Sequence, residues 1–461
     1  MLIPDAAEWA DSTFGECNLG DKRRTKRLVQ LSEKIASSIG QSVVKSCSNS
    51  SEIEGAYRLI RNENILPEDI ADGAFNATAK LAQHSNVLLA LEDTTNISFS
   101  HEVAKELGYT SSSSDSRIGG FLVHSILLVD AESQQTLGLV EQNRWVRELK
   151  EFGKRADKQK REYKTKESFK WENASRQMAE RLGTVINQTV SVCDREADVI
   201  EYLDYKQQHK QRFVVRARAN RPLVNGNHLY EYLKIQKPAG SYTLEIPQRG
   251  GRKARKTTME IRFAMVEVLA PERKQKKIPA IKCYGIYCKE KGKRKDGLEW
   301  FLLTSEAIDS LEQARTIVGY YEARWKVEEF HKAWKSGGTQ VEKLRMQSAG
   351  NIERMAVILA FVAVRLLQLR EVASSQKDSK RKCTEVFTDI QWKLLWAKIE
   401  KTKPRKNFIP SLVWAYESLG RLGGWNDSKN NGRIGWNALW DGWMKLESLV
   451  EGYELRTAIE M

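Results

Sequence analysis

The spacing of apolar residues along the chain changes twice. In the first part they recur every three or four positions, as at Leu28, Leu31 and Ile35, which is typical of amphipathic helices. From about residue 86 they come in short continuous runs, which are typical of buried strands. Beyond about residue 373 helical spacing returns. The pattern therefore predicts a helical domain at 1–70, a mixed domain at 71–372 and a second helical domain at 373–461.

The mixed domain predicts strands and helices in a definite order. Three strand-like runs come first, at Val87–Asp93, Phe121–Val129 and Gln135–Val140. A helix near Glu167–Leu182, a strand at Gln188–Asp194, a helix at Ala197–Gln208 and a strand at Arg212–Arg216 follow. Three consecutive strands and then strands separated by helices are the order of the ribonuclease-H-like fold, a mixed sheet flanked by helices. We therefore expect an α/β protein with such a core and helical domains on either side in the sequence.

A β-rich insertion interrupts this order at about 220–299. Its alternating segments are Tyr242–Pro247, Thr258–Val266 and Ile281–Tyr287. The connectors are strongly basic, at Arg252–Lys256, Arg273–Lys277 and Lys289–Lys295. Such loops suit either contacts to DNA or solvated hairpin tips, and the pattern leaves both open. The run that begins at Trp300 then returns to a core strand.

Residues 321–335 have a pronounced amphipathic pattern. At about 100° per residue, polar residues gather on one arc and apolar residues on the opposite arc. The polar arc holds Tyr321, Arg324, Glu328, His331, Lys332 and Lys335, and the apolar arc holds Ala323, Val327, Phe330 and Trp334. An ordinary solvated face mixes both signs of charge, whereas here one carboxylate stands among donors that suit phosphates. A surface helix rich in salt bridges and a phosphate-facing helix with a metal ligand are the two interpretations.

The overall charge favours a polyanionic partner. The chain has 75 Lys and Arg against 60 Asp and Glu, a net charge of +15. We expect nucleic acid rather than a membrane, because no apolar run approaches the roughly 20 residues of a spanning helix. The start lacks the basic and apolar regions of a signal peptide, so we expect a cytoplasmic protein. The six cysteines are scattered without a metal-ligand spacing, which predicts reduced structural thiols rather than a zinc site.

Three acidic residues suggest a reaction. Asp93 and Asp194 each end an apolar run of strand type, and Glu328 lies on the polar arc. In a ribonuclease-H-like sheet the ends of neighbouring strands converge, and a later helix can supply a third ligand. Two Asp and one Glu suit two Mg²⁺ ions, or Mn²⁺ in their place, which activate an attacking oxygen and stabilise a leaving one in phosphoryl transfer. The neighbouring acids Glu92, Glu196, Asp198 and Glu329 could be confused with these ligands, and we expect Asp198 to cap or orient.

The first helical domain carries clustered basic residues. A capped helix start at Leu19-Gly-Asp21 precedes Arg23, Arg24, Lys26 and Arg27, and a second helix carries Arg58 and Arg61. They suit phosphate contacts, with some reaching base edges, but a solvated charged face is an equal alternative. The last domain holds seven of the thirteen tryptophans, which predicts a packed core or a homodimer contact.

These motifs resemble the DDE transposases of the insertion-sequence-four family. The resemblance is carried by Asp93-Thr-Thr95, by Cys193-Asp-Arg-Glu-Ala-Asp198, and by Tyr321, Arg324, Glu328 and Lys335 in the spacing Tyr-two-Arg-three-Glu-six-Lys. It extends over essentially the whole chain, through Leu19-Gly-Asp21, Glu54-Gly-Ala-Tyr-Arg58, Phe361–Arg370 and Arg421-Leu-Gly-Gly424. The four-residue signature around Glu328 is highly specific. The insertion and residues 372–410 depart from the family, so the domain edges there are open.

The resemblance implies cut-and-paste transposition in a bacterium, on nucleoid DNA. One strand is nicked, the freed 3′-hydroxyl forms a hairpin with the opposite strand, and the reopened end is joined to target DNA. Asp93, Asp194 and Glu328 would hold two metal ions. Tyr321, Arg324, Lys335 and Arg216 would grip phosphates, with His331 and Lys332 beside them, and Trp300 would stack a flipped base. The first helices would bind the transposon ends and the last would form a homodimer.

Two alternatives remain at the level of sequence. One is a metal-dependent nuclease without strand transfer, which shares the chemistry. The other is a catalytically silent regulator that binds DNA ends. The intact set of three acids with Tyr321, Arg324 and Lys335 favours the transposase.

Overall fold

The structure is a computed structural model, and it describes residues 3, 5–108, 110, 119–147, 162–246, 254–271, 278–292, 294, 296–374, 381–426, 428 and 433–460. The chain forms two compact units. The sheet unit comprises Thr78–Ile246 and Arg255–Glu328, and the helical unit comprises Met1–Ala77, Pro247–Ala254 and Glu329–Met461.

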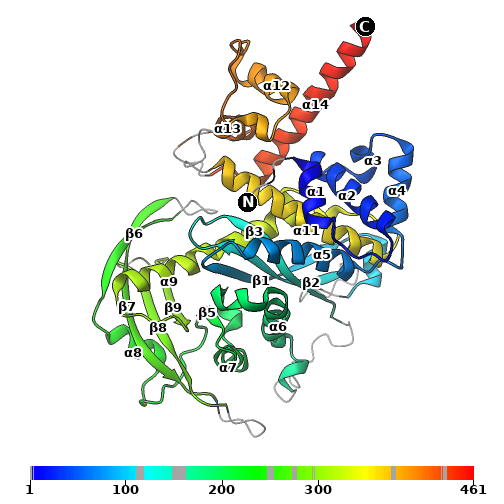
Figure 1. The fold of residues 1–461 in the computed structure, drawn as a ribbon. Coiled ribbons are helices and arrows are strands. Elements are labelled where there is room, and N and C mark those ends of the chain that lie inside the picture. Colours follow the sequence, from blue (N-terminus) through cyan, green and yellow to red (C-terminus); the bar gives the residue numbers. More distant parts are fainter. Residues whose placement is uncertain are drawn as a thin grey trace. The chain divides into compact units, whose positions relative to one another are not determined.

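The described part of the sheet unit contains one nine-stranded mixed sheet with the order β3-β2-β1-β4-β5-β9-β8-β7-β6 (Figure 1). Its strands are β1 (Leu88–Phe99), β2 (Gly119–Asp130), β3 (Thr136–Trp145), β4 (Thr189–Cys193), β5 (Arg212–Arg216), β6 (Gly240–Ile246), β7 (Arg255–Val268), β8 (Ile281–Glu290) and β9 (Glu299–Thr304). β4 pairs in parallel with β1 and with β5, and the other neighbours are antiparallel. The ribonuclease-H-like α/β core that the sequence predicts is confirmed.

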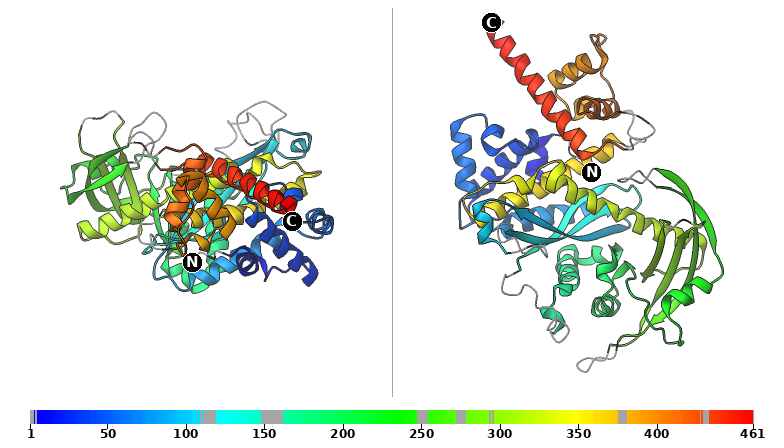
Figure 2. Two further views of the ribbon diagram at one scale, coloured as in Figure 1. Left: turned by 90° about the horizontal axis from the view of Figure 1, so that it is seen from above. Right: turned by 180° about the vertical axis from the view of Figure 1, so that it is seen from behind.

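Helices cover the sheet because its central strands are apolar on both faces. The helices of this unit are α6 (Lys170–Leu182), α7 (Ile200–Gln208), α8 (Leu229–Ile235) and α9 (Leu311–Ala323). Figure 1 and the view from behind in Figure 2 place α6 and α7 on one face of the sheet and α9 on the other. On the α6 and α7 face, Trp171 and Tyr202 pack against Phe213 and Val215 of β5 in one buried cluster.

One predicted strand end in this unit is wrong. β1 does not end at Asp93 but continues to Phe99, because polar residues such as Thr94 still pair with β2. The strands of the predicted β-rich insertion continue the same sheet, because β9 pairs with both β8 and the core strand β5. The basic connectors at 252–256, 273–277 and 289–295 lie wholly or partly outside the described residues.

The helical unit is built around one long buried helix. Its helices are α1 (Ala6–Phe14), α2 (Lys22–Ser37), α3 (Val43–Ser46), α4 (Ser50–Ile60), α11 (Ala349–Ala373), α12 (Asp389–Glu400), α13 (Leu412–Leu422) and α14 (Trp436–Glu460), while α5 (Pro67–Ala82) and α10 (Trp325–Lys332) contribute residues to both units. Phe361 of α11 contacts Phe14 and Phe75 with ring centroids 5.6 Å apart in each pair. Arg354 of α11 donates to the backbone oxygens of Ile65 and Ile60 at 2.7 and 3.1 Å. These contacts hold the first helices onto α11.

The tryptophans of the last helices form a core, as one of the two interpretations predicts. Trp392 is buried, and Trp396, Trp414, Trp425, Trp436 and Trp443 pack partly buried against the same cluster. Trp440 lies directly over Gly40, where an added Cβ would come within 1.4 Å of the ring. Residues 375–380, which follow α11, lie outside the described residues. No described helix is long and apolar enough to cross a membrane.

The segment 321–335 is not the single regular helix that its pattern predicts. α9 ends at Ala323, α10 spans Trp325–Lys332, and a π-helical turn follows at Ala333–Gly337. A π turn holds more residues than an α turn, so the arcs drawn at a constant angle do not persist. The apolar residues Val327, Phe330 and Trp334 are fully buried as expected, but Tyr321 and His331 are also buried.

Candidate active site

Asp93 on β1 and Asp194, the residue directly after β4, come to equivalent positions along two adjoining strands. The parallel pairing of β1 with β4 runs from Leu88–Thr189 to Leu91–Val192. Each aspartate lies two residues beyond the last of these pairs, so both side chains are at one level and on one face of the sheet. Asp194 also accepts a hydrogen bond from the backbone N–H of Glu196 at 2.8 Å, which fixes its side chain at the start of a short 3₁₀ turn.

The two aspartates influence each other electrostatically. Burial raises the pKa of Asp194 above its usual value, and the negative charge of Asp93 raises that pKa further. The guanidinium of Arg324 acts in the opposite direction on the pKa of Asp194. Two carboxylates in this relation repel each other, and a bound cation would relieve the repulsion.

Arg324 connects Glu328 to this pair. Its Nη2 donates to Oε1 of Glu328 at 2.6 Å, one helical turn away, and their side chains are 14% and 24% exposed. Burial lowers the pKa of Arg324, but the neighbouring Tyr321, Asp93 and Glu328 outweigh it and raise that pKa above its usual value. The guanidinium is therefore a shared partner of Asp93 and Glu328.

The three carboxylates suit a divalent cation in chemistry. Carboxylate oxygens are the ligands that Mg²⁺ and Mn²⁺ prefer, and the repulsion between Asp93 and Asp194 favours a cation. Within the described part of the chain, however, no three His, Cys, Asp or Glu side chains are grouped closely enough to hold an ion. The Glu328 carboxylate is bonded to Arg324 in this structure. Ligation by Glu328 requires its carboxylate to turn from Arg324 or to be shared with it.

Two aromatic rings continue the site toward β9. Trp300, half-buried on β9, meets the ring of Tyr321 edge-on with centroids 5.6 Å apart. The guanidinium of Arg324 also lies over the Tyr321 ring, 5.9 Å from its centre. Arg216, at the end of β5, donates to the backbone oxygen of Glu299 at 3.1 Å. The structure thus brings Trp300, Tyr321 and Arg324 together, although Tyr321 is only 7% exposed rather than on an open polar face.

The remaining residues of the predicted arc belong to the helical unit. His331 is 5% exposed and its ring packs against Phe330, so its side chain does not lie on an open polar face. A contact of His331 with DNA stays a prediction. Lys332 pairs with Glu329 at 3.0 Å, and Lys335 pairs with Glu342 at 3.5 Å. Both lysines are thus in ion pairs.

The acids that flank the three candidates have other partners. Glu196 pairs with Lys170 at 3.1 Å, and Glu329 pairs with Arg370 at 2.6 Å. Asp198 accepts from the backbone N–H of Arg218 at 2.8 Å and pairs with Arg221 at 2.7 Å. The expectation that Asp198 caps or orients is therefore confirmed.

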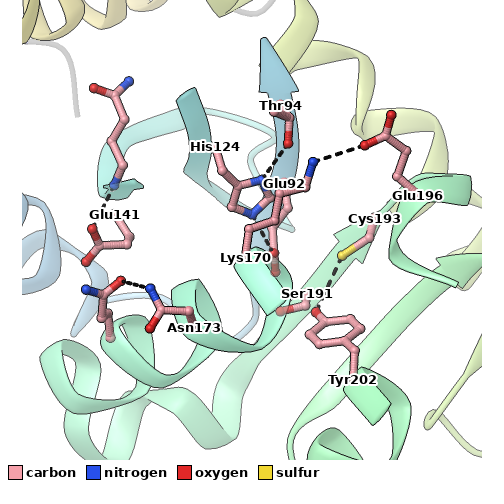
Figure 3. A network of polar contacts seen from close by, with 12 residues as sticks. Glu92, Thr94, His124, Glu141, Lys170, Asn173, Ser191, Cys193, Glu196 and Tyr202 are labelled. Carbon is pink, nitrogen blue, oxygen red and sulfur yellow. Dashed lines mark hydrogen bonds and ion pairs between the residues drawn. The ribbon is translucent and has the colours of Figure 1, made fainter. Parts of the chain in front are cut away.

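A buried polar network behind Asp93 was not predicted from the sequence. Glu92, the residue before Asp93, lies within 3.3 Å of the His124 ring on β2, and neither side chain is exposed (Figure 3). The available signal was a single histidine inside the apolar run Phe121–Val129. Such a histidine is usually a core residue with satisfied hydrogen bonds, so the pattern alone did not mark it.

The basic residues at the start of α2 divide into exposed and packed side chains. Asp21 caps α2 by accepting from the backbone N–H of Arg23 at 2.8 Å, as the sequence predicts. Arg23 and Lys26 are exposed, and Arg23 also pairs with Asp21. Arg24 instead donates to the backbone oxygen of Leu19 at 3.0 Å.

The other three arginines are oriented by contacts around α4. Arg27 crosses α4 at Gly55, where an added Cβ would lie 2.5 Å from its guanidinium carbon. Arg58 pairs with Glu54 on the exposed side of α4. Arg61 lies over the ring of Tyr57 at 4.9 Å. Of the six basic residues predicted to contact DNA, Arg23, Lys26, Arg58 and Arg61 are therefore exposed, whereas Arg24 and Arg27 are partly enclosed.

Two segments of the chain, one in each of the regions just described, match known protein families. Residues 6–65 match the family described as transposase DNA-binding, and residues 170–365 match the transposase DDE domain. The second match includes Asp194 and Glu328, and Asp93 precedes it. The chain therefore contains a transposase DNA-binding domain near its start and a transposase DDE domain over part of its mixed sheet, and both matches support a DDE transposase.

Proposed function

We propose that this protein is a cut-and-paste transposase of the insertion-sequence-four family, similar to the transposase of the bacterial transposon Tn-five. The support is the juxtaposition of Asp93 and Asp194 on adjoining strands, with Arg324 bonded to Glu328 beside them. The four-residue signature of Tyr321, Arg324, Glu328 and Lys335 adds to this support.

Asp93, Asp194 and Glu328 are the proposed metal ligands. Two Mg²⁺ ions, or Mn²⁺ in their place, would activate the attacking oxygen and stabilise the leaving oxygen of an in-line displacement. Asp93 presents its carboxylate from β1, and Asp194 directly follows β4 with its side chain fixed by the bond from Glu196, so little reorganisation of the two aspartates is needed. Glu328 contributes from the helix once its carboxylate is released by Arg324. The freed guanidinium then has a phosphate oxygen as its natural partner.

The hairpin step assigns roles to the neighbouring side chains. Arg324, Arg216, Tyr321 and Lys335 hold phosphates next to the scissile bond, and Lys332 adds positive charge. Trp300 offers a half-buried ring at the edge of the site on which an extruded base stacks. The contact of Trp300 with Tyr321 links base stacking to phosphate positioning.

The domain roles follow the chain. Residues 1–70 bind the transposon ends, 71–372 form the catalytic domain with its insertion at about 220–299, and 373–461 form the dimerisation domain. Residues 451–460 of α14 are exposed throughout. Among them Tyr453, Leu455 and Ile459 are 48%, 65% and 84% exposed, which suits a contact with a second copy in a synaptic complex. In the cell such a protein would be held on the nucleoid.

The juxtaposition of Asp93 with Asp194 is the observation that carries the proposal. The test is a denaturing gel of end-bearing duplex DNA incubated with the protein and Mg²⁺. A nick followed by a hairpin at the end supports the proposal. Nicks without hairpins indicate a nuclease, and binding without cleavage indicates a silent regulator, so either result overturns it.

A further inference from the structure

His124 bonds to both neighbours of Asp93. Its Nδ1 lies 3.0 Å from the hydroxyl of Thr94, and its Nε2 lies 3.3 Å from Oε2 of Glu92 (Figure 3). Residues 92 and 94 flank Asp93, and alternation along β1 puts their side chains on one face and Asp93 on the other. His124 therefore contacts β1 on the face opposite the Asp93 side chain, at the two residues that flank Asp93.

These contacts of His124 lie where β1 is no longer paired with β4 and is paired only with β2. The parallel pairing with β4 ends at Leu91–Val192, while the antiparallel pairing with β2 continues to Phe99. Around Asp93 the strand is thus aligned by β2 alone. His124 is directly opposite Thr94 in this pairing, so its side chain adds a tie across the strands at the point where the ladder is one-sided.

The surroundings of His124 favour one tautomer of its imidazole ring. The ring is fully buried and meets Trp171 edge-on at 4.5 Å. Burial lowers the pKa of His124, although Glu92 acts to raise that pKa, so the ring is neutral at neutral pH. A neutral ring carries one N–H; donation from Nε2–H to the Glu92 carboxyl group leaves Nδ1 to accept from the Thr94 hydroxyl. Both nitrogens are then used, and rotation of the ring would break both bonds.

We infer that His124 is a positioning residue, which acts through Thr94 and Glu92 to aim the Asp93 carboxylate at the metal. The inference rests on the proposed role of Asp93 as a metal ligand. Residues that orient the ligands of a metal commonly alter its affinity by about 10- to 100-fold when they are replaced.

The test measures metal binding without catalysis. Mn²⁺ is titrated into the full-length protein, and the free ion is followed by its paramagnetic resonance signal. Thr94→Val removes the hydroxyl at nearly constant volume and is expected to raise the Mn²⁺ dissociation constant about tenfold, whereas Thr94→Ser is expected to retain the wild-type value. Thr189→Val is the matched control, since it removes a hydroxyl bonded to the Val185 backbone at the far end of β4.

A double substitution tests whether Thr94 affects Mn²⁺ binding through His124. If Thr94 acts through His124, the Thr94→Val, His124→Phe protein binds Mn²⁺ no more weakly than His124→Phe alone. Additive weakening overturns the inference, as does wild-type binding by Thr94→Val or equal weakening by Thr189→Val. Asp93→Ala is measured alongside: if it binds Mn²⁺ like the wild type, the proposed function fails as well. If only Asp93→Ala loses the ion, the inference alone fails.

Discussion

Asp93 and Asp194 are level with each other across the β1–β4 boundary, each two residues past the Leu91–Val192 pair. This relationship is set by strand register, so it does not depend on a mobile loop. Burial raises the pKa of Asp194, and repulsion from the charge of Asp93 raises that pKa further. Such a pair is preorganised for a cation rather than for stability.

Replacement of any of the three acids should separate cleavage from DNA binding. Asp93→Ala, Asp194→Ala and Glu328→Ala are each expected to lower the nicking rate by on the order of a thousandfold or more, because a lost ligand removes several kcal/mol of transition-state stabilisation. Binding to end DNA should stay close to wild type, since cations make the phosphate contacts. Nicking assays with Mg²⁺ and gel-shift titrations measure the two quantities. A variant that nicks normally removes its residue from the site.

The exposed cations of α2 should contribute to the salt dependence of end binding. Arg23→Ala with Lys26→Ala is expected to lower the slope of log affinity against log salt by about 1.8, since each phosphate contact contributes about 0.9. Lys393→Ala with Lys398→Ala removes the same charge from the exposed side of α12 and serves as the control. Equal slopes for the wild type and the α2 variant would make this run a solvated face.

A buried ion pair should make the β7–β8 region sensitive to acid. Glu290 is 4% exposed and pairs with Arg255 at 2.7 Å, and it also accepts from Thr257 and from the backbone of Leu298. These bonds lower the pKa of Glu290 to about 2, despite the opposing effect of burial. A lowered pKa stabilises the fold above the unfolded value of about 4.5, and this contribution is lost as the pH falls toward 2.

Glu290→Gln is therefore expected to lower the free energy of unfolding by about 2–3 kcal/mol at pH 7, with a smaller difference at pH 3.5. Urea unfolding at the two pH values measures this difference. Glu245→Gln is the matched control, because the Glu245–Lys256 pair at 2.8 Å is 72% and 74% exposed and should contribute little. A deficit for Glu290→Gln that is the same at both pH values would contradict the ionic explanation.

Gly40 should tolerate no side chain, because of Trp440. Its φ of +69° is unfavourable for other residues, and an added Cβ would also enter the indole ring. Gly40→Ala is expected to lower the free energy of unfolding by about 2–4 kcal/mol, from backbone strain and overpacking together. Gly424, with φ +94° and no atom within 4 Å of an added Cβ, isolates the strain. If Gly424→Ala is as damaging in calorimetry, the Trp440 contact is not what restricts Gly40.

Sequence patterns predicted the strands of this fold better than their ends. The run Gln188–Asp194 was predicted to within about one residue of β4, because a short apolar run between helices has few alternatives. β1 was cut short at Asp93, since hydrophobicity marks burial and not pairing: Thr94, Thr95 and Asn96 remain in the ladder with β2 while only half-buried. The position of Asp93 beside Asp194 follows from register, which no single strand encodes.

The segment 321–335 shows a second limit of prediction from sequence, which concerns helix geometry. Its apolar residues were identified correctly, because burial of Val327, Phe330 and Trp334 needs only local periodicity. The π turn after Lys332 could not be expected from that periodicity, and the burial of His331 was missed with it. The bond between His124 and Glu92 depends on two strands distant in sequence, so a lone histidine in an apolar run gave no indication of its partner.

Trp300 offers a test that separates a hairpin-forming transposase from a nuclease. Its ring is half-buried against Tyr321, so it can act as a packing residue or as a platform for a flipped base. Stacking of a base contributes roughly 1–3 kcal/mol, and only the hairpin, with its tight backbone turn, needs an extruded base. Trp300→Ala should therefore leave the first nick nearly unchanged and slow hairpin formation by about ten- to a hundredfold. Trp300→Phe keeps an aromatic face, so its rate of hairpin formation should lie between those of the wild type and Trp300→Ala. Time courses on end-labelled DNA resolve nick and hairpin in one lane, and equal slowing of both steps, or a lowered melting temperature, would show that Trp300 only packs.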